Sequence, residues 1–175
     1  RSDTSLDSMS RLSPAFLPKI GSVTAATSAP LSDGAAAMVV MSEAAARRYG
    51  LTPLVRVVST AVVGVSPALM GLGPVYATRK VLHRSGLRLQ EIEIVELNEA
   101  FAVQAMACMN ELEFDHEIVN IHGGSLAIGH PLGASGIRIA TTLIHTMRDR
   151  HARLGLATMC IGFGQGIAVV FELIE

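Results

Sequence analysis

The chain has 175 residues, of which 50% are hydrophobic and 17% charged, and its formal net charge is −1. That length suits one compact domain with a core of its own, and the near-zero charge excludes the strong field of a nucleic-acid-binding or membrane-surface protein. Aromatic residues make up 4% of the chain, with no tryptophan, which argues against a base-stacking surface, and no apolar run reaches the roughly 18 residues of a membrane span.

The high apolar content predicts that another domain or subunit covers part of the surface. The two cysteines, Cys108 and Cys160, form neither a CxxC pair nor a metal-ligand spacing with histidine. We therefore predict no disulfide framework, no metal site and a reducing compartment. No signal peptide is visible, and because the chain begins at Arg1 rather than Met, we expect a fragment or a processed product.

Hydrophobic patterning and helix-end residues predict the elements in chain order. We expect a polar lead-in or linker over 1–20, a strand over 35–42, a helix over 43–49, a strand over 54–65, a helix over 74–86, a strand over 92–97, a buried helix over 99–112, a strand over 117–121, a helix over 135–150, and strands over 154–160 and 166–174. This alternation predicts a layered α/β domain around a largely buried sheet. The short glycine-rich link between the last two strands predicts an antiparallel hairpin, which makes the sheet mixed.

The stretch NIHGGSLAIGHPLGASGIR, residues 120–138, is unusually dense in glycine just before a predicted helix. Glycine is entropically costly unless the backbone needs unusual dihedral angles or a close approach. His130 lies in this stretch, where the N–H groups at a helix start suit an anion or a developing oxyanion and a neutral imidazole can accept a proton. The alternative is a turn whose histidine bonds only to backbone, and the glycine density favours a site.

Two further motifs lie at strand ends. Cys160 in CIGFGQG has glycine amides beside it, which suits proton transfer near an oxyanion hole, although a buried structural cysteine is an equal alternative. Asn98 in ELNEAFA is by itself better explained as a helix cap, with a polarising amide as the functional alternative. Cys108 lies about 15 Å further along that helix by the helical rise, so we assign it to the core. We expect four other histidines to be solvated, namely His83, His116, His145 and His151.

Taken together and in this order, NEAFA, GGSLAIGHPLGASG and CIGFGQG resemble motifs of the C-terminal half of thiolases, the 3-ketoacyl-CoA and acetoacetyl-CoA thiolase family. SDGAAAMVVMSE and MGLGPVYATRKVL also match, and LDSMSRLSPAF matches loosely, so the resemblance covers essentially the whole chain. The separations 130 − 98 = 32 and 160 − 130 = 30 also fit the family.

This resemblance implies one half of a thiolase, with a five-stranded mixed sheet and helices on both faces. It implies a lead-in over 1–20 from an N-terminal half and a C-terminal domain over 21–175. The implied partners are acyl-CoA and CoA as substrates, the N-terminal half, and further copies in a dimer or tetramer of full-length chains. No cofactor beyond coenzyme A as a substrate is implied. The expected location is the cytoplasm in a bacterium, or the mitochondrion or peroxisome in a eukaryote.

The same resemblance assigns roles to the residues of the three motifs. His130 activates a nucleophilic cysteine and helps to form an oxyanion hole, Asn98 holds a water that completes this hole, and Cys160 moves the proton at the α-carbon of acetyl-CoA. The backbone N–H of Gly162 belongs to a second oxyanion hole. The positions matched to coenzyme A or acyl contacts are Arg1, Ser8, Phe16, Ser28, Ala29, Met70 and Phe101.

The sequence departs from the family pattern at several points. The family's nucleophilic cysteine lies in an N-terminal half, and neither Cys108 nor Cys160 replaces it, so we expect these residues alone to be inactive. Ala29 stands where many members have a serine, with Ser28 adjacent. Phe163 stands where many members have a glycine, and we expect it either to narrow the acyl pocket or to pack outward. Met70 matches a methionine near the acyl group, with a core methionine as the alternative.

The predicted function is that of a thiolase, which cleaves 3-ketoacyl-CoA with CoA or runs the reverse Claisen condensation of acetyl-CoA. The stretch VNIHGG leans toward the branch of fatty-acid β-oxidation. A ketoacyl-synthase-like condensing enzyme, which shares the fold and a GH-LGA-G element, is one alternative. A non-catalytic acyl-CoA-binding or lipid-binding relative is another, against which the combination of Asn98, His130 and Cys160 argues.

Overall fold

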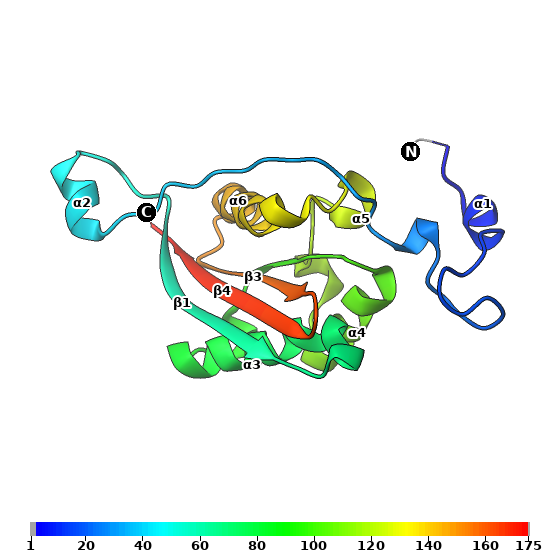
Figure 1. The fold of residues 1–175 in the computed structure, drawn as a ribbon. Helices are drawn as coiled ribbons and strands as arrows, with labels where there is room; N and C mark the ends of the chain where they lie inside the picture. The colour runs from blue at the N-terminus through cyan, green and yellow to red at the C-terminus, as the bar shows by residue number, and fades with distance from the viewer. Residues whose placement is uncertain (1–2, 175) are drawn as a thin grey trace.

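A computed structural model describes residues 3–174. Its centre is a four-stranded mixed sheet in the order β1-β4-β3-β2 (Figure 1). The strands are β1 Val55–Gly64, β2 Ile94–Leu97, β3 Leu154–Ile161 and β4 Gln165–Leu173. β4 pairs antiparallel with both β1 and β3, whereas β2 pairs parallel with β3. The predicted mixed sheet and the predicted hairpin over the last two strands are therefore confirmed.

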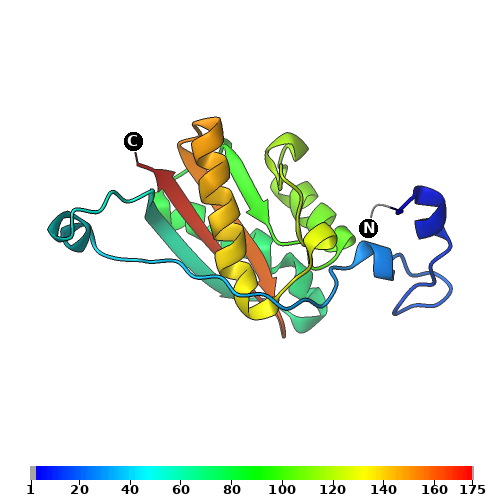
Figure 2. The ribbon, with the colours of Figure 1, turned by 90° about the horizontal axis from the view of Figure 1, so that it is seen from above.

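Helices cover both faces of this sheet, as predicted (Figures 1 and 2). α6, Leu132–Arg150, packs on one face, and α3, Gly73–Ser85, packs on the other beside α4, Ala102–Leu112. Because side chains alternate along a strand, Leu154 and Leu156 of β3 join the core under α3 and α4, while Ala157 joins the core under α6. The sheet is thus buried on both faces.

The helix ends follow from local sequence. Pro74 lies in the first turn of α3, where its missing N–H costs nothing, and Gly86 ends the helix with φ +69°, a conformation that glycine adopts without strain. The shorter elements are α1 Leu6–Ser10, η1 Ala25–Thr27, α2 Glu43–Arg48, η2 Pro67–Leu72, η3 Leu89–Glu91, η4 His116–Ile118 and α5 Ser125–Ile128.

The expectation of a fifth strand is wrong. Residues 117–121 form the one-turn helix η4 and then a single bridge from Val119 to Val95, where Asn120 N donates to Val95 O. The apolar run over 35–42 forms no strand either, because no strand lies beside it among the described residues. The helix over 99–112 is also less buried than predicted, since Met106 and Val103 are exposed on α4.

Residues 29–41 form a long connection between η1 and α2, here called the strap. It runs past α6 without helix or strand and leads to α2, which stands away from the sheet (Figures 1 and 2). Met38 packs against the core under α6, whereas Leu31, Val39 and Val40 point into solvent. Within residues 3–174, none of the helices has both the length and the apolarity to cross a membrane.

Candidate active site

Asn98 follows β2 directly and is fully buried. Its backbone N donates to Thr158 O at 3.0 Å, which fixes it beside β3. Its side chain does not cap α4, because that helix begins at Ala102 and its N-cap is Phe101. Instead, Asn98 Oδ1 accepts from Ser125 Oγ at 2.7 Å, and Nδ2 lies 3.3 Å from His130 Nε2. The helix-cap explanation of Asn98 is therefore wrong, and its amide is directed at the predicted histidine.

His130 lies in the loop that leads into α6, and bonds on three sides hold it there. Its backbone N donates to Pro30 O in the strap at 3.1 Å, its Nδ1 lies 2.6 Å from Ser135 Oγ, and its Nε2 faces Asn98. Partial burial, followed by the nearby charge of Arg138, lowers the pKa of His130 below its ordinary value. The imidazole is therefore neutral at neutral pH and can accept a proton.

Cys160 lies near the end of β3 and is buried. It pairs with Gly166 of β4, and burial raises the pKa of its thiol. Cys108 is itself fully buried and donates to Gly71 O at 3.2 Å, in agreement with its assignment to the core.

The sheet is narrower beside Cys160. β2 ends at Leu97, opposite Thr158, so no strand of the described residues pairs with β3 on that edge beside Cys160. The Cys160 thiol makes no hydrogen bond to His130 within residues 3–174, and the convergence of these two side chains stays a prediction.

Gly162 and Phe163 form the turn between β3 and β4. Gly162 is exposed, and a Cβ there would contact nothing within 4 Å. Phe163 is 94% exposed and has φ +64°. Of the two expectations for Phe163, the structure supports outward packing, because its ring points into solvent and fills no pocket.

Four of the residues matched to coenzyme A contacts meet close to Asn98. The rings of Phe16 and Phe101 form an edge-to-face contact with centroids 6.3 Å apart. Ser28 pairs with Phe101 in an antiparallel bridge, and Ala29 N donates to Ala100 O at 3.0 Å. The segments 14–30 and 98–101, distant in sequence, thus form one surface beside the site.

Two of the other matched residues, Ser8 and Met70, are not part of that surface. Ser8 lies in α1, far from the sheet in Figure 1, and its hydroxyl bonds within a capping box with Ser5. Met70 is half-buried in η2, which packs against α4, β3 and β4. Arg1 lies outside the described residues.

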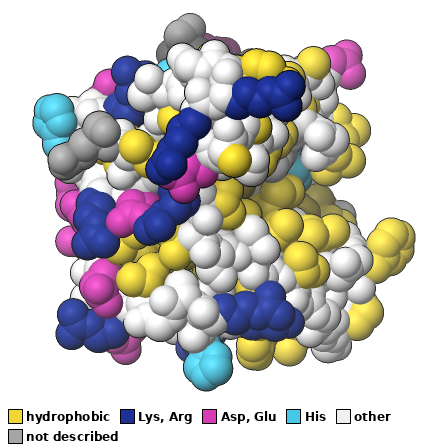
Figure 3. Space-filling view, turned by 90° about the vertical axis from the view of Figure 1, so that its left-hand side faces the viewer, with side chains coloured by type: hydrophobic (Ala, Val, Ile, Leu, Met, Phe, Trp, Pro, Cys, Tyr) yellow, Lys and Arg dark blue, Asp and Glu magenta, His cyan; other side chains and the backbone are white. Residues whose placement is uncertain are grey.

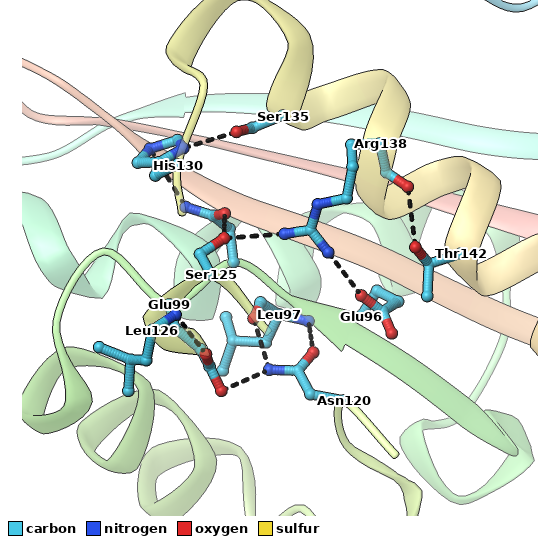
Figure 4. A network of polar contacts seen from close by, with 11 residues as sticks. Glu96, Leu97, Glu99, Asn120, Ser125, Leu126, His130, Ser135, Arg138 and Thr142 are labelled. Carbon is cyan, nitrogen blue, oxygen red and sulfur yellow. Dashed lines mark hydrogen bonds and ion pairs between the residues drawn. The ribbon is translucent and has the colours of Figure 1, made fainter. Parts of the chain in front are cut away.

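Polar residues that the sequence did not single out surround the pair of Asn98 and His130 (Figure 4). Ser125, Ser135 and Arg138 line the histidine loop and the start of α6, and Glu96 points toward Arg138 from β2. One signal was available, because Glu96 and Asn98 share one face of a strand that is otherwise apolar. No spacing rule joins them to Ser125 or Arg138, which come from another part of the chain.

A hollow of about 450 Å³ opens at His130 and is lined also by Leu31, Ser32, Asp33 and Leu132. A larger hollow of about 670 Å³ lies over α4 and contains Glu99 but neither His130 nor Asn98. Glu99 bonds to Leu126 N and Asn120 Nδ2 and so supports the loop rather than the histidine. Within residues 3–174, no three His, Cys, Asp or Glu side chains come together as a metal site would need.

Comparison with protein families and known structures gives a consistent result. A model of "Thiolase, C-terminal domain" matches residues 51–173, and a model of "Thiolase, N-terminal domain" matches residues 1–44. The 3-ketoacyl-CoA thiolases of Marinomonas sp. (strain MWYL1) and Aeromonas salmonicida (strain A449) are 55% and 57% identical over 98% of this chain. The chain spans 45% of the length of each of these relatives.

Solved structures agree with this fold. The acetyl-CoA acetyltransferase of Bacillus anthracis superimposes with a TM-score of 0.96 at 42% identity, over 99% of this chain and 44% of that one. A human mitochondrial 3-ketoacyl-CoA thiolase in complex with CoA superimposes with a TM-score of 0.92 at 37% identity, over 100% of this chain and 44% of that one.

Proposed function

The chain belongs to the thiolase family, and we propose that residues 1–175 supply the base and the proton-transfer thiol of a thiolase that cleaves 3-ketoacyl-CoA with CoA. The observation that carries this proposal is the contact of Asn98 Nδ2 with His130 Nε2, 3.3 Å apart at the end of a buried strand. The CoA complex of a human thiolase with the same fold supports CoA as the substrate. The 3-ketoacyl-CoA thiolases among the relatives support the degradative direction.

Opposite pKa shifts assign the acid and the base. Burial raises the pKa of Cys160, so this thiol keeps its proton at neutral pH, whereas burial lowers the pKa of His130, so this imidazole lacks one. Two groups whose pKa values move apart in one site are suited to opposite proton transfers. Cys160 therefore acts first as the acid and His130 first as the base.

The reaction then proceeds in two steps. A nucleophilic thiol gives its proton to His130 Nε2 and attacks C3 of the 3-ketoacyl-CoA, the C2–C3 bond breaks, and the acetyl-CoA enolate takes a proton from Cys160. CoA then attacks the acyl carbon and its thiol proton passes to the Cys160 thiolate. The bond from the acyl group to the nucleophile breaks, and the nucleophile takes its proton back from His130, which restores the site. Asn98, with its amide at His130, and the Gly162 N–H stabilise the oxyanions of the two steps.

The nucleophile must come from outside these 175 residues, because Cys108 is fully buried within α4 and Cys160 carries the other role. We propose that the rest of an N-terminal thiolase domain packs onto the strap and brings this cysteine to the hollow at His130. The strap is suited to such a contact, since Leu31, Val39 and Val40 are 93%, 82% and 74% exposed. Figure 3 shows one face on which apolar side chains gather around a hollow, as an uncovered interface would. The division into a lead-in over 1–20 and a domain over 21–175, and the dimeric or tetrameric assembly, stay predictions.

Substitutions in the complete protein test these roles one by one. We expect Cys160→Ser to leave acyl transfer to the nucleophile largely intact and to stop formation or cleavage of the carbon–carbon bond. We expect His130→Ala to abolish both half-reactions. Cys108→Ser is the matched control, because it changes a buried thiol that bonds to Gly71 O and Gln104 and has no assigned role, and it should keep both half-reactions. Equal losses in both half-reactions with Cys160→Ser would refute the assigned role of Cys160.

A further inference from the structure

An ion pair lies in the core directly behind the site. Glu96 is 1% exposed at its side chain and Arg138 17%, and Glu96 Oε2 lies 3.5 Å from Arg138 Nη1 (Figure 4). Within the described residues, neither oxygen of Glu96 nor Nε of Arg138 has a hydrogen-bond partner. Burying two charges costs more than such loose contacts return. The pair is therefore poorly explained as a contribution to stability, and a role in the site has to be considered.

Arg138 sets the direction of the hydrogen bonds that lead to His130. A guanidinium only donates, so Ser125 Oγ accepts from Arg138 Nη2, at 2.8 Å. Within the described residues, Asn98 Oδ1, at 2.7 Å, is the one acceptor for the Ser125 hydroxyl proton. Because Asn98 Oδ1 is thereby held at Ser125, the NH₂ group of the same amide is turned toward His130.

The amide orientation in turn selects the tautomer of the histidine. Asn98 Nδ2 only donates, so His130 Nε2, 3.3 Å away, must offer its lone pair. The ring proton of the neutral form then resides on Nδ1, which donates to Ser135 Oγ at 2.6 Å. Ser135 Oγ passes the same direction on, since it donates to Pro131 O at 3.1 Å. Each hydrogen bond in the series from Arg138 Nη2 to Pro131 O then joins one donor to one acceptor.

We propose that Arg138, paired with Glu96, is a positioning residue, which holds Ser125 and through it fixes the orientation of Asn98 and the Nδ1–H tautomer of His130. His130 Nε2 then carries no proton in the resting protein, so it can accept the proton of an attacking thiol. Without this constraint, a neutral imidazole in water favours the Nε2–H form, which cannot accept that proton. The use of this tautomer in catalysis rests on the proposed function, whereas the tautomer itself does not.

The test compares variants of the complete protein by the ¹⁵N chemical shifts of its histidine rings and by thiolysis kinetics. His130→Gln identifies the His130 signals by their loss. In the parent protein we expect a protonated Nδ1 and an unprotonated Nε2. Arg138→Lys replaces a guanidinium, which contacts Glu96 and Ser125 through two different nitrogens, by a single ammonium. Ser125→Ala removes the hydroxyl that joins Arg138 to Asn98. Both should shift the ring toward the Nε2–H form and lower kcat about tenfold to a hundredfold, with KM for the acyl-CoA unchanged.

Two comparisons keep the test decisive. The double variant Ser125→Ala/Arg138→Lys should be no slower than the slower single variant, since both break one series of bonds. Thr142→Ala is the matched control, because it removes only a hydroxyl that donates to the backbone oxygen of Arg138, and it should change neither the ring shifts nor kcat.

A proton on Nε2 in the parent protein would overturn the proposal, and so would ring shifts unchanged in both Arg138→Lys and Ser125→Ala. Shifted tautomers with an unchanged kcat would refute the positioning role. If the ring shifts behave as expected in a protein that has no thiolase activity, the assigned tautomer holds and the proposed function fails.

Discussion

The strap over residues 29–41 and the strand β1 over Val55–Gly64 share a local pattern, since both contain runs of small and β-branched residues. β1 pairs with β4 along its whole length, and on its other side Lys80 and Arg84 of α3 donate to Val62 O and Thr60 O. The strap has no neighbouring strand within residues 3–174. The difference shows that the pattern specifies an extended backbone, whereas a hydrogen-bonding neighbour decides whether it becomes a strand.

The strap is nevertheless fixed where it crosses the candidate site. Ala29 N and Pro30 O bond to Ala100 O and to His130 N, on either side of the crossing. Further along, a side chain at Gly34 would touch the ring of Pro131. Beyond this point Val39 and Val40 are open to solvent. The strap is therefore held to the site at one end and uncovered at the other, which the following predictions can test.

The largest effect is expected from opening the core. Leu143 of α6 is fully buried, whereas Val39 of the strap is 82% exposed. In a protein of residues 1–175, Leu143→Ala should lower the free energy of unfolding by about 2–5 kcal/mol, and Val39→Ala by less than about 0.5 kcal/mol. Urea denaturation measures both.

The same pair measured in the complete protein sharpens the comparison. If the strap is covered there, Val39→Ala should cost about 1–2 kcal/mol, in line with the apolar area removed from a buried site. An equal, negligible cost in both proteins would mean that the strap stays uncovered.

The next largest effect concerns the buried carboxyl group of Glu96. Burial raises the pKa of Glu96 to about 7 from 4.5, although the nearby charge of Arg138 opposes the rise. The folded state thus binds this proton more tightly than the unfolded state. As pH rises from 4.5 to 7, the stability of the parent protein relative to Glu96→Gln should fall by about 3 kcal/mol, and it should stay constant outside that window.

Denaturant titrations of the two proteins across this pH range measure that difference. His130, whose pKa is lowered, acts in the opposite direction, losing stability as pH falls below its unfolded value. It is present in both proteins and cancels. A difference that does not change with pH would show that the buried carboxyl of Glu96 titrates as it does in the unfolded chain.

The sequence predicted correctly those helices and strands whose hydrophobic pattern and end residues lie within the local sequence. The strands β1, β3 and β4 and the helix α3 were predicted within about two residues. The strand predicted over 35–42 is wrong, because no strand lies beside this run among the described residues. His130 was singled out by the density of glycine around it at a strand end of an α/β sheet. Asn98 was assigned to the site only through the family resemblance. Glu96 and Arg138 were missed because only tertiary packing brings β2 against α6.

A smaller effect is expected where the strap crosses the histidine loop. Gly129 has φ +97° and ψ 165°, a region essentially restricted to glycine, and a Cβ there would overlap Ser32 Oγ of the strap. Gly129→Ala should therefore cost about 1–3 kcal/mol. Gly133→Ala is the matched control in the same loop-to-helix segment, because a Cβ there meets nothing within 4 Å, and it should be neutral or slightly stabilising. Equal effects of the two substitutions in thermal unfolding would show that the strap does not constrain the loop.

The smallest effect is expected at Phe163, in the turn beside Gly162. Phe163 and Leu31 are the most exposed large apolar side chains of the described residues, at 94% and 93%, and Leu31 lies at the site on the strap. Because Phe163 has φ +64°, Phe163→Gly should relieve backbone strain and stabilise residues 1–175 by up to about 1 kcal/mol, reduced by the greater freedom of glycine in the unfolded chain. Phe163→Ala keeps the strain and should bring no gain. A gain in residues 1–175 that becomes a loss in the complete protein would mean that the Phe163 ring is buried there.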